Sequence, residues 1–200
     1  MSAAALLGRM RERSALLALP RPVARFRRRA VRLARELGDD WALDAATGPR
    51  DLATLAGLAR GRERIAELGT ARGWTTASLA LAEPGAHVVS FDPVSHEHRD
   101  RYVALAGPDA RARIALEQAQ GADGAVDAQP VDMLFIDSTH ERDATVAEYR
   151  AWEPRLRAGA VVAFHDYGHP GFPGVAEAIR ILDLSGEVRG GLFVATARGA

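Results

Sequence analysis

The chain has 200 residues, of which 48% are hydrophobic and 26% charged, and its formal net charge is zero. These values fit a globular domain with a sizeable core, and the neutral charge favours neither nucleic acid nor a membrane surface as a partner. Cysteine and lysine are absent, which excludes disulfides, thiolate metal sites, cysteine nucleophiles and a lysine base. No apolar run approaches the ~20 residues of a membrane span, so we expect a cytoplasmic protein.

The N-terminal part of the chain is basic. Residues 1–36 carry ten arginines against Glu12 and Glu36, a net charge of +8, so the other 164 residues carry −8. Helical spacing predicts one helix over residues 3–18 and a second from about Pro22 to Gly38. We predict a basic helical arm or cover over residues 1–48, ahead of a main domain over residues 49–200. Its arginine face is interpreted as solvated; a transit peptide, an anionic partner, a lid and a homo-oligomer contact are the alternatives.

From residue 49 onward, predicted strands alternate with predicted helices. The predicted helices are Asp51–Ala59, Thr75–Ala82, His96–Leu105, Glu141–Trp152 and Val175–Leu182. The predicted strands are Arg64–Leu68, His87–Phe91, Arg113–Glu117, Val131–Asp137 and Ala160–Phe164, followed by a hairpin of residues 187–189 and Leu192–Thr196. This alternation predicts an α/β fold: a Rossmann-like, doubly wound sheet of seven strands, mostly parallel, with a C-terminal antiparallel hairpin and helices on both faces.

A glycine-containing turn joins the first predicted strand to its helix, where backbone N–H groups and a helix N-terminus face a ligand. A P-loop requires a lysine after the last glycine, and Trp74 stands there instead. A dinucleotide fingerprint requires glycine at its first, third and sixth positions, which hold Gly69, Ala71 and Trp74. The sequence therefore disfavours both a P-loop and an NAD or FAD site.

A loop for S-adenosylmethionine is the interpretation that fits best, because this ligand has no phosphate and needs close backbone approach. An acid about 20 residues further on, at the end of the second strand, suits its ribose hydroxyls. A glycine turn used only for tight packing is the alternative. The candidate cofactor-binding residues in this part of the chain are Glu67, Gly69, Thr70, Gly73, Thr75, Thr76 and Asp92.

Three stretches carry a resemblance to a known family. They are Glu67 to Gly73 (ELGTARG), Val131 to His140 (VDMLFIDSTH) and Leu156 to Tyr167 (LRAGAVVAFHDY). Over residues 50–197 the chain resembles the class I S-adenosylmethionine-dependent methyltransferases, in particular the macrocin-type and catechol-type O-methyltransferases. The resemblance implies methyl transfer to a small-molecule hydroxyl, with Gln118 or Gln120 as the adenine contact. Ala71 departs from the glycine of many relatives, which costs little unless that position requires a positive φ.

Acidic and histidine side chains follow two of the predicted strands. Asp137 follows one strand and the pair His165-Asp166 follows the next. Neighbouring strands lie ~4.8 Å apart, so these groups can reach one ion. The set suits Mg²⁺ or Mn²⁺, with zinc or iron also open. In metal-dependent relatives acids at these positions hold the metal, and His165 replaces one of them. Alternatively, Asp137 and Asp166 cap helices or bind the amino group of adenosylmethionine.

His140 is the candidate general base. Catechol-type relatives place a catalytic lysine at about this position, and an imidazole can accept a proton near neutral pH. A histidine that only closes the site or caps a helix is the alternative. With Asp137, His140 forms the predicted catalytic pair. We expect metal-assisted O-methylation; a metal-independent methyltransferase, an inactive adenosylmethionine-binding protein and an NAD enzyme are the competing hypotheses.

Overall fold

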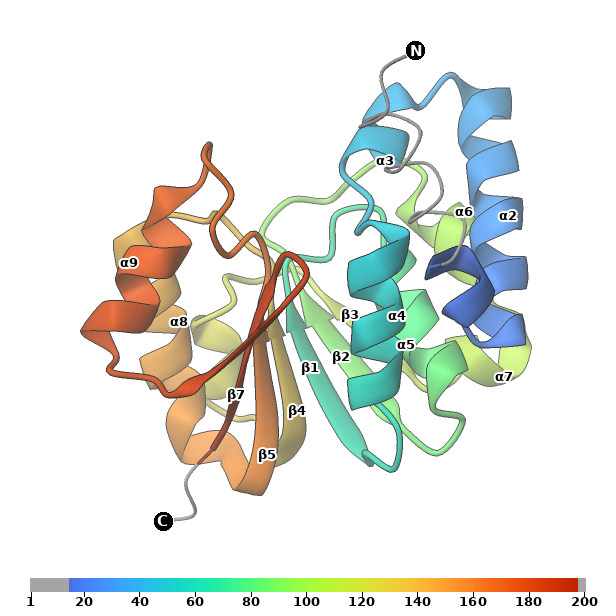
Figure 1. Cartoon of the computed structure of the whole chain (residues 1–200). Helices are drawn as coiled ribbons and strands as arrows, with labels where there is room; N and C mark the ends of the chain where they lie inside the picture. Colours follow the sequence, from blue (N-terminus) through green and yellow to red (C-terminus); the bar gives the residue numbers. More distant parts are fainter. Residues whose placement is uncertain (1–14, 198–200) are drawn as a thin grey trace.

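The computed structural model describes residues 15–197, which form a seven-stranded sheet with helices on both faces (Figure 1). The strand order is β3-β2-β1-β4-β5-β7-β6. Strands β1 to β5 pair in parallel, and β7 is antiparallel to both β5 and β6. The predicted fold class is confirmed. The strands are β1 (Arg64–Leu68), β2 (His87–Phe91), β3 (Ile114–Glu117), β4 (Val131–Ile136), β5 (Leu156–Phe164), β6 (Gly186–Arg189) and β7 (Leu192–Thr196).

Two layers of helices cover the sheet (Figure 1). On one face, Leu55 and Leu79 from the helices pack with Ile65 and Met133 from the strands. On the other face, α8 and α9 pack against β1, β4 and β5. The α-helices are α2 (Arg21–Leu37), α3 (Asp40–Asp44), α4 (Pro49–Leu58), α5 (Trp74–Ala82), α6 (Arg99–Ala104), α7 (Pro108–Arg111), α8 (Arg142–Trp152) and α9 (Pro173–Ile181); η1 (Asp123–Ala125) and η2 (Glu153–Arg155) are short 3₁₀ turns.

The central strand β4 shows why the sheet is buried on both faces. All six of its residues are buried, and successive side chains of a strand point to opposite faces. Met133 and Phe135 therefore enter the core on one face, and Leu134 and Ile136 enter the core on the other. Near-continuous apolar strands of this kind are typical of parallel sheets covered by helices.

The strand order reverses between β1 and β4, and this position determines where the site forms. At such a switch point the loops that follow the two strands diverge and leave a crevice. The loop after β1 and the start of the loop after β4 are in contact here. A Cβ atom on Gly69, whose φ is +100°, would lie 2.0 Å from the backbone oxygen of Asp137. Only glycine fits this approach of the two loops.

The N-terminal helix α2 covers the edge of the helical layer that contains α5. Phe26, Ala30 and Ala34 pack with Trp74 and Tyr102, and Gly38 ends the helix in a left-handed conformation (φ 65°). Of the predicted helix over residues 3–18, positions 15–18 are helical and the remainder lies outside the described residues. Within residues 15–197, no helix combines the length and apolar composition needed to cross a bilayer.

Three local predictions differ from the structure. The helix predicted to start at His96 starts at Arg99, because His98 adopts a left-handed conformation that interrupts helical geometry. The strand predicted to start at Ala160 starts at Leu156, and the register of β5 with β4 shifts in this added part, where Gly159 has a φ of +74°. Helices α3 and α7 were not predicted, since neither completes two turns.

Candidate active site

One cavity of about 420 Å³ opens at the carboxyl ends of β1, β4 and β5. The loop between β1 and α5, residues 69–73, forms one wall of the cavity; we call it the glycine loop. Helix α3 and the loop that follows it form another wall. The loops after β4 and β5 complete the cavity with polar side chains. Its main polar and aromatic lining residues are Trp41, Thr70, Arg72, Thr75, Asp137, Ser138, His140, His165, Asp166, His169 and Phe172.

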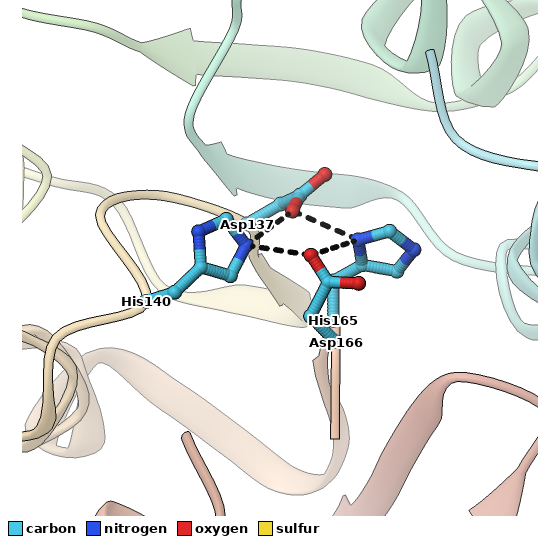
Figure 2. Close-up of side chains that lie close together, drawn as sticks. All are labelled: Asp137, His140, His165 and Asp166. Carbon is cyan, nitrogen blue, oxygen red and sulfur yellow. Dashed lines mark hydrogen bonds and ion pairs between the residues drawn. The ribbon is translucent and has the colours of Figure 1, made fainter. Parts of the chain in front are cut away.

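Four side chains in this cavity form a closed ring of alternating oxygen and nitrogen atoms (Figure 2). Asp137 Oδ1 lies 3.2 Å from His140 Nε2 and 2.9 Å from His165 Nδ1. Asp166 Oδ2 lies 3.1 Å from His140 Nε2 and 3.5 Å from His165 Nδ1. Each carboxylate thus contacts both imidazoles, and all four ligand atoms lie within 4.8 Å of one another. We call this group the Asp–His ring.

Parallel strand pairing brings the Asp–His ring together. Ile136 at the end of β4 pairs with Phe164 at the end of β5, and the His165 N–H donates to Ile136 O. The residues that follow the two strands therefore emerge side by side. His140 and Asp166 have left-handed backbones, with φ of 61° and 55°. Such strain in residues other than glycine is concentrated at functional sites in proteins.

The charges of the ring balance when both imidazoles are protonated. Burial acts to lower the pKa of His140, but Asp137 and Asp166 outweigh it and raise the pKa to about 9. The pKa of His165 is raised to about 12 by the same carboxylates, again against the effect of burial. Burial favours a higher pKa for Asp137 and Asp166, yet the two histidines hold both pKa values below the usual range.

The same ring also fits one divalent cation. Two ligand atoms that each lie about 2.1 Å from one ion, with a right angle between the two bonds, are about 3 Å apart. The four oxygen–nitrogen distances in the ring are 2.9–3.5 Å. A ligand set that adds imidazole nitrogen to the two carboxylate oxygens favours Mn²⁺, iron or zinc over Mg²⁺, which prefers oxygen ligands. Because a bound imidazole must be neutral at its ligating atom, cation binding would displace protons from the ring.

The glycine loop is held by the neighbouring strand β2. The Ala71 N–H donates to Asp92 Oδ2 over 2.8 Å, and the Thr70 and Ser90 hydroxyls lie 2.7 Å apart. Ala71 has a φ of 47°, so this position does require the left-handed conformation. An alanine is strained in this conformation, so the departure from the glycine of many relatives does have a cost.

Glu67 lies behind the glycine loop and is fully buried. Its Oε2 accepts hydrogen bonds from the hydroxyls of Thr76 and Ser90. Its Oε1 has no hydrogen-bond partner within residues 15–197. Burial raises the pKa of Glu67 to about 8, although the two hydroxyls act to lower it.

The candidate cofactor residues fall into two groups. Gly69, Thr70 and Thr75 line the cavity. Glu67, Thr76 and Asp92 lie behind the loop, where Asp92 also accepts the Val94 N–H over 2.8 Å. Gly73, with φ +75°, caps α5, and a Cβ atom there would meet Val103 at 2.6 Å. Gln118 and Gln120 are exposed and outside the cavity lining.

Sequence reasoning missed a buried network that joins α3 to the glycine loop. Asp39 caps α3 by accepting the Ala42 N–H, and it accepts two hydrogen bonds from Arg72 (2.8 and 2.9 Å). Tyr102 donates its hydroxyl hydrogen to the same carboxylate. The Arg72 guanidinium also lies over the ring of Trp41 in α3, with its Cζ 4.9 Å from the ring centroid. An N-cap aspartate was the only signal available for this network.

An aromatic wall on the opposite side of the cavity was also missed. The Phe172 ring stacks on His140 at 4.5 Å and on His169 at 4.8 Å between ring centroids. Phe172 lies in the loop after β5 and is 38% exposed, so the sequence offered no periodic pattern that marks it as part of a site.

Comparison with known proteins places this geometry in context. A family model described as a methyltransferase domain matches residues 66–167, slightly more than half of the chain. This range contains the glycine loop and all four residues of the Asp–His ring. None of the curated proteins compared with the chain matches it.

Several solved structures share the fold. The O-methyltransferase TomG from Streptomyces achromogenes, solved with S-adenosylmethionine, is 23% identical, with a TM-score of 0.65 and coverage of 90% of this chain and 91% of that one. A TDP-rhamnose 3'-O-methyltransferase of calicheamicin biosynthesis is 18% identical (TM-score 0.63; 98% and 95% covered). An O-methyltransferase from Bacillus cereus, in complex with S-adenosylhomocysteine, is 17% identical (TM-score 0.60; 83% and 90% covered).

Proposed function

The chain belongs to a methyltransferase-domain family. On this premise we propose that it transfers a methyl group from S-adenosylmethionine to a hydroxyl oxygen of a small molecule. The observation that carries the proposal is a shared cavity: the glycine loop and the Asp–His ring line the same 420 Å³ space. A methyl donor on the loop and an acceptor oxygen at the ring would therefore face each other. Holding two reactants in line is the main requirement of methyl transfer, because the sulfonium already activates the methyl group.

The proposed cofactor site uses both groups of candidate residues. Gly69, Thr70 and Thr75 would contact S-adenosylmethionine directly. Glu67 would support the loop from behind, since its Oε2 accepts hydrogen bonds from the hydroxyls of Thr76 and Ser90. Asp92 Oδ2 accepts the Ala71 N–H and also contacts Arg99 and His96, whereas Oδ1 accepts only the Val94 N–H among residues 15–197. Oδ1 would therefore keep a lone pair for a ribose hydroxyl. For the adenine we propose Gln118 or Gln120, at the end of β3.

The proposed chemistry at the acceptor oxygen involves the Asp–His ring. Asp137, His165 and Asp166 would hold a divalent cation, which when bound lowers the pKa of an acceptor hydroxyl. His140 would then not ligate the cation, and its Nε2 would accept the hydroxyl proton. With no cation the raised pKa of His140, about 9, keeps it protonated near neutral pH. The base role of His140 and the occupation of the ring by a cation are therefore coupled in this proposal.

The test is a methyl-transfer assay with radiolabelled S-adenosylmethionine and a panel of sugar, phenol and lipid-like alcohol acceptors. The assay is run after EDTA treatment and after adding back Mn²⁺ or Mg²⁺. We expect turnover with at least one acceptor, its loss in EDTA and its recovery with Mn²⁺. His140→Gln should lower kcat by about 10²- to 10⁴-fold yet retain S-adenosylhomocysteine binding, while the exposed His87→Gln is the matched control.

Other outcomes identify the competing functions. Full activity in EDTA would contradict the cation assignment and leave a metal-independent methyltransferase. Binding of S-adenosylhomocysteine without turnover on any acceptor, in the presence of Mn²⁺, would favour a binding protein that lacks catalysis. Absence of adenosyl ligand binding would contradict the proposed function as a whole.

A further inference from the structure

A fifth ionisable side chain contacts the Asp–His ring from outside it. Asp51 Oδ2 lies 3.6 Å from His165 Nε2, an ion-pair distance rather than a hydrogen bond. This nitrogen is on the opposite side of the imidazole from Nδ1, which faces Asp137 and Asp166 (Figure 2). His165 is therefore held between carboxylates at both of its ring nitrogens.

Asp51 itself is held in place from a third element. Its Oδ1 accepts the Gly191 N–H over 3.0 Å, in the turn of the β6–β7 hairpin. The Gly191 carbonyl in turn accepts the N–H of Tyr167, one residue after Asp166. The first turn of α4, the hairpin turn and the end of β5 thus meet around this carboxylate (Figure 1).

The two glycines of the hairpin turn leave room for the carboxylate. A Cβ atom on Gly190 would lie 2.2 Å from Asp51 Oδ1, and one on Gly191 would lie 2.8 Å from Asp51 Oδ2. Any side chain at either position would therefore push the carboxylate away from His165. The side chain of Asp51 is only 18% exposed, so few other positions are open to it.

We propose that Asp51 is a positioning residue of the methyl-transfer site, which orients the His165 imidazole through Nε2 so that Nδ1 faces Asp137 and Asp166. The inference rests on the proposed function for the role of the ring. A carboxylate behind a ligating histidine fixes its orientation and increases the basicity of the ligating nitrogen. Asp51 lies outside residues 66–167, which the family model matches.

A purely structural role is the competing explanation. Asp51 is an acid in the first turn of α4, where a negative charge stabilises the helix dipole. Asp143 is likewise an acid in the first turn of α8, and its partner among residues 15–197 is the neighbouring Arg142. Asp143→Asn therefore removes the same charge from the first turn of another helix without touching the ring, and it is the control for Asp51→Asn.

The experiment measures two properties of the full chain that helix stability does not change. The first is the Mn²⁺ affinity, determined by electron paramagnetic resonance. The second is the ¹⁵N shifts of the His165 ring in metal-free protein, with His165→Gln used for assignment among the six histidines. We expect Asp51→Asn to weaken Mn²⁺ binding by about 10- to 100-fold and to shift the His165 nitrogens more than those of the other histidines, whereas Asp143→Asn changes neither.

A second variant keeps the carboxylate and moves it. Gly191→Ala places a Cβ atom against Asp51 Oδ2 and should reproduce both effects of Asp51→Asn. Gly57→Ala in α4, where a Cβ atom meets nothing within 4 Å, is its control. Wild-type His165 shifts and Mn²⁺ affinity in both variants would overturn the inference. If the wild-type chain binds no Mn²⁺, the cation part of the proposed function fails, and the His165 shifts alone decide the role of Asp51.

Discussion

At the residue scale, the cavity contains three left-handed residues that are not glycine: Ala71, His140 and Asp166. This conformation costs an L-residue roughly 1–2 kcal/mol. For His140 and Asp166 the strained backbone places a side chain in the Asp–His ring. The methyl group of Ala71 has no comparable role, so its strain should be removable.

Ala71→Gly should therefore stabilise the chain. Relief of the left-handed strain outweighs the greater flexibility of glycine in the unfolded state, and we expect a gain of about 0.5 kcal/mol in the free energy of unfolding. Urea unfolding measures it. Ala53→Gly, inside α4, is the control and should lose about 1 kcal/mol, because helical geometry favours alanine. A loss of stability in Ala71→Gly would contradict the assigned strain.

The stability of the metal-free chain should depend on pH through His140. Its pKa is raised from 6.5 to about 9 in the folded state, so its stabilisation is complete below pH 6.5 and is lost as the pH rises through 9. In EDTA we expect the free energy of unfolding to fall by about 1 kcal/mol per pH unit from this group between pH 7 and 9. Urea unfolding across this range should show a shallower fall in His140→Gln than in His87→Gln. Equal slopes in the two variants would contradict the ion pairs of His140.

At the scale of elements, α3 is the part of the N-terminal segment that reaches the cavity. It is only five residues long, too short for stability from helical hydrogen bonds alone. Its position over the glycine loop depends on Asp39, which contacts α3, Arg72 and Tyr102.

Asp39→Ala should detach α3 from the loop. Removing one partner of a buried ion pair leaves the other uncompensated, and we expect a loss of about 3 kcal/mol in the free energy of unfolding. Weaker S-adenosylhomocysteine binding should accompany it, because Arg72 lines the cavity; urea unfolding and calorimetry measure the two effects. Tyr102→Phe removes a single hydrogen bond and should lose about 1 kcal/mol. Equal losses in the two variants would show that the Arg72 pair contributes nothing.

Elements with a regular pattern could be predicted from the sequence, and those without one could not. The bounds of β1, β2 and β7 agree with prediction because each is a short, mostly apolar segment between turn residues. Asp137, His165 and Asp166 could be predicted to lie together because each follows a central strand. That His140 joins them depends on a left-handed backbone, and the contact of Asp51 with His165 joins distant segments through tertiary packing. Neither leaves a periodic signal.

At the scale of the whole molecule, the sheet brings two loops that are distant in sequence to one crevice. The loop after β1 would hold the methyl donor, and the loops after β4 and β5 carry the Asp–His ring. The contact between Gly69 and Asp137 joins these two parts. The turn between β6 and β7 contacts the same crevice, because the Gly191 N–H donates to Asp51. The C-terminal strands lie outside the residues that the family model matches, and they also support the site.

The identity of the ligand that this crevice selects can be tested on the whole chain by thermal unfolding. Trp74 is buried at the first position of α5, where a dinucleotide site needs glycine for close helix packing against a pyrophosphate. We therefore expect S-adenosylhomocysteine at ~100 times its Kd to add about 2.7 kcal/mol and to raise Tm by roughly 5–11 °C. NAD at the same concentration should leave Tm unchanged, and adenosine alone should give a smaller shift, because it lacks the amino-acid portion that the loop would contact. A rise with NAD and none with S-adenosylhomocysteine or S-adenosylmethionine would overturn the assignment of the loop.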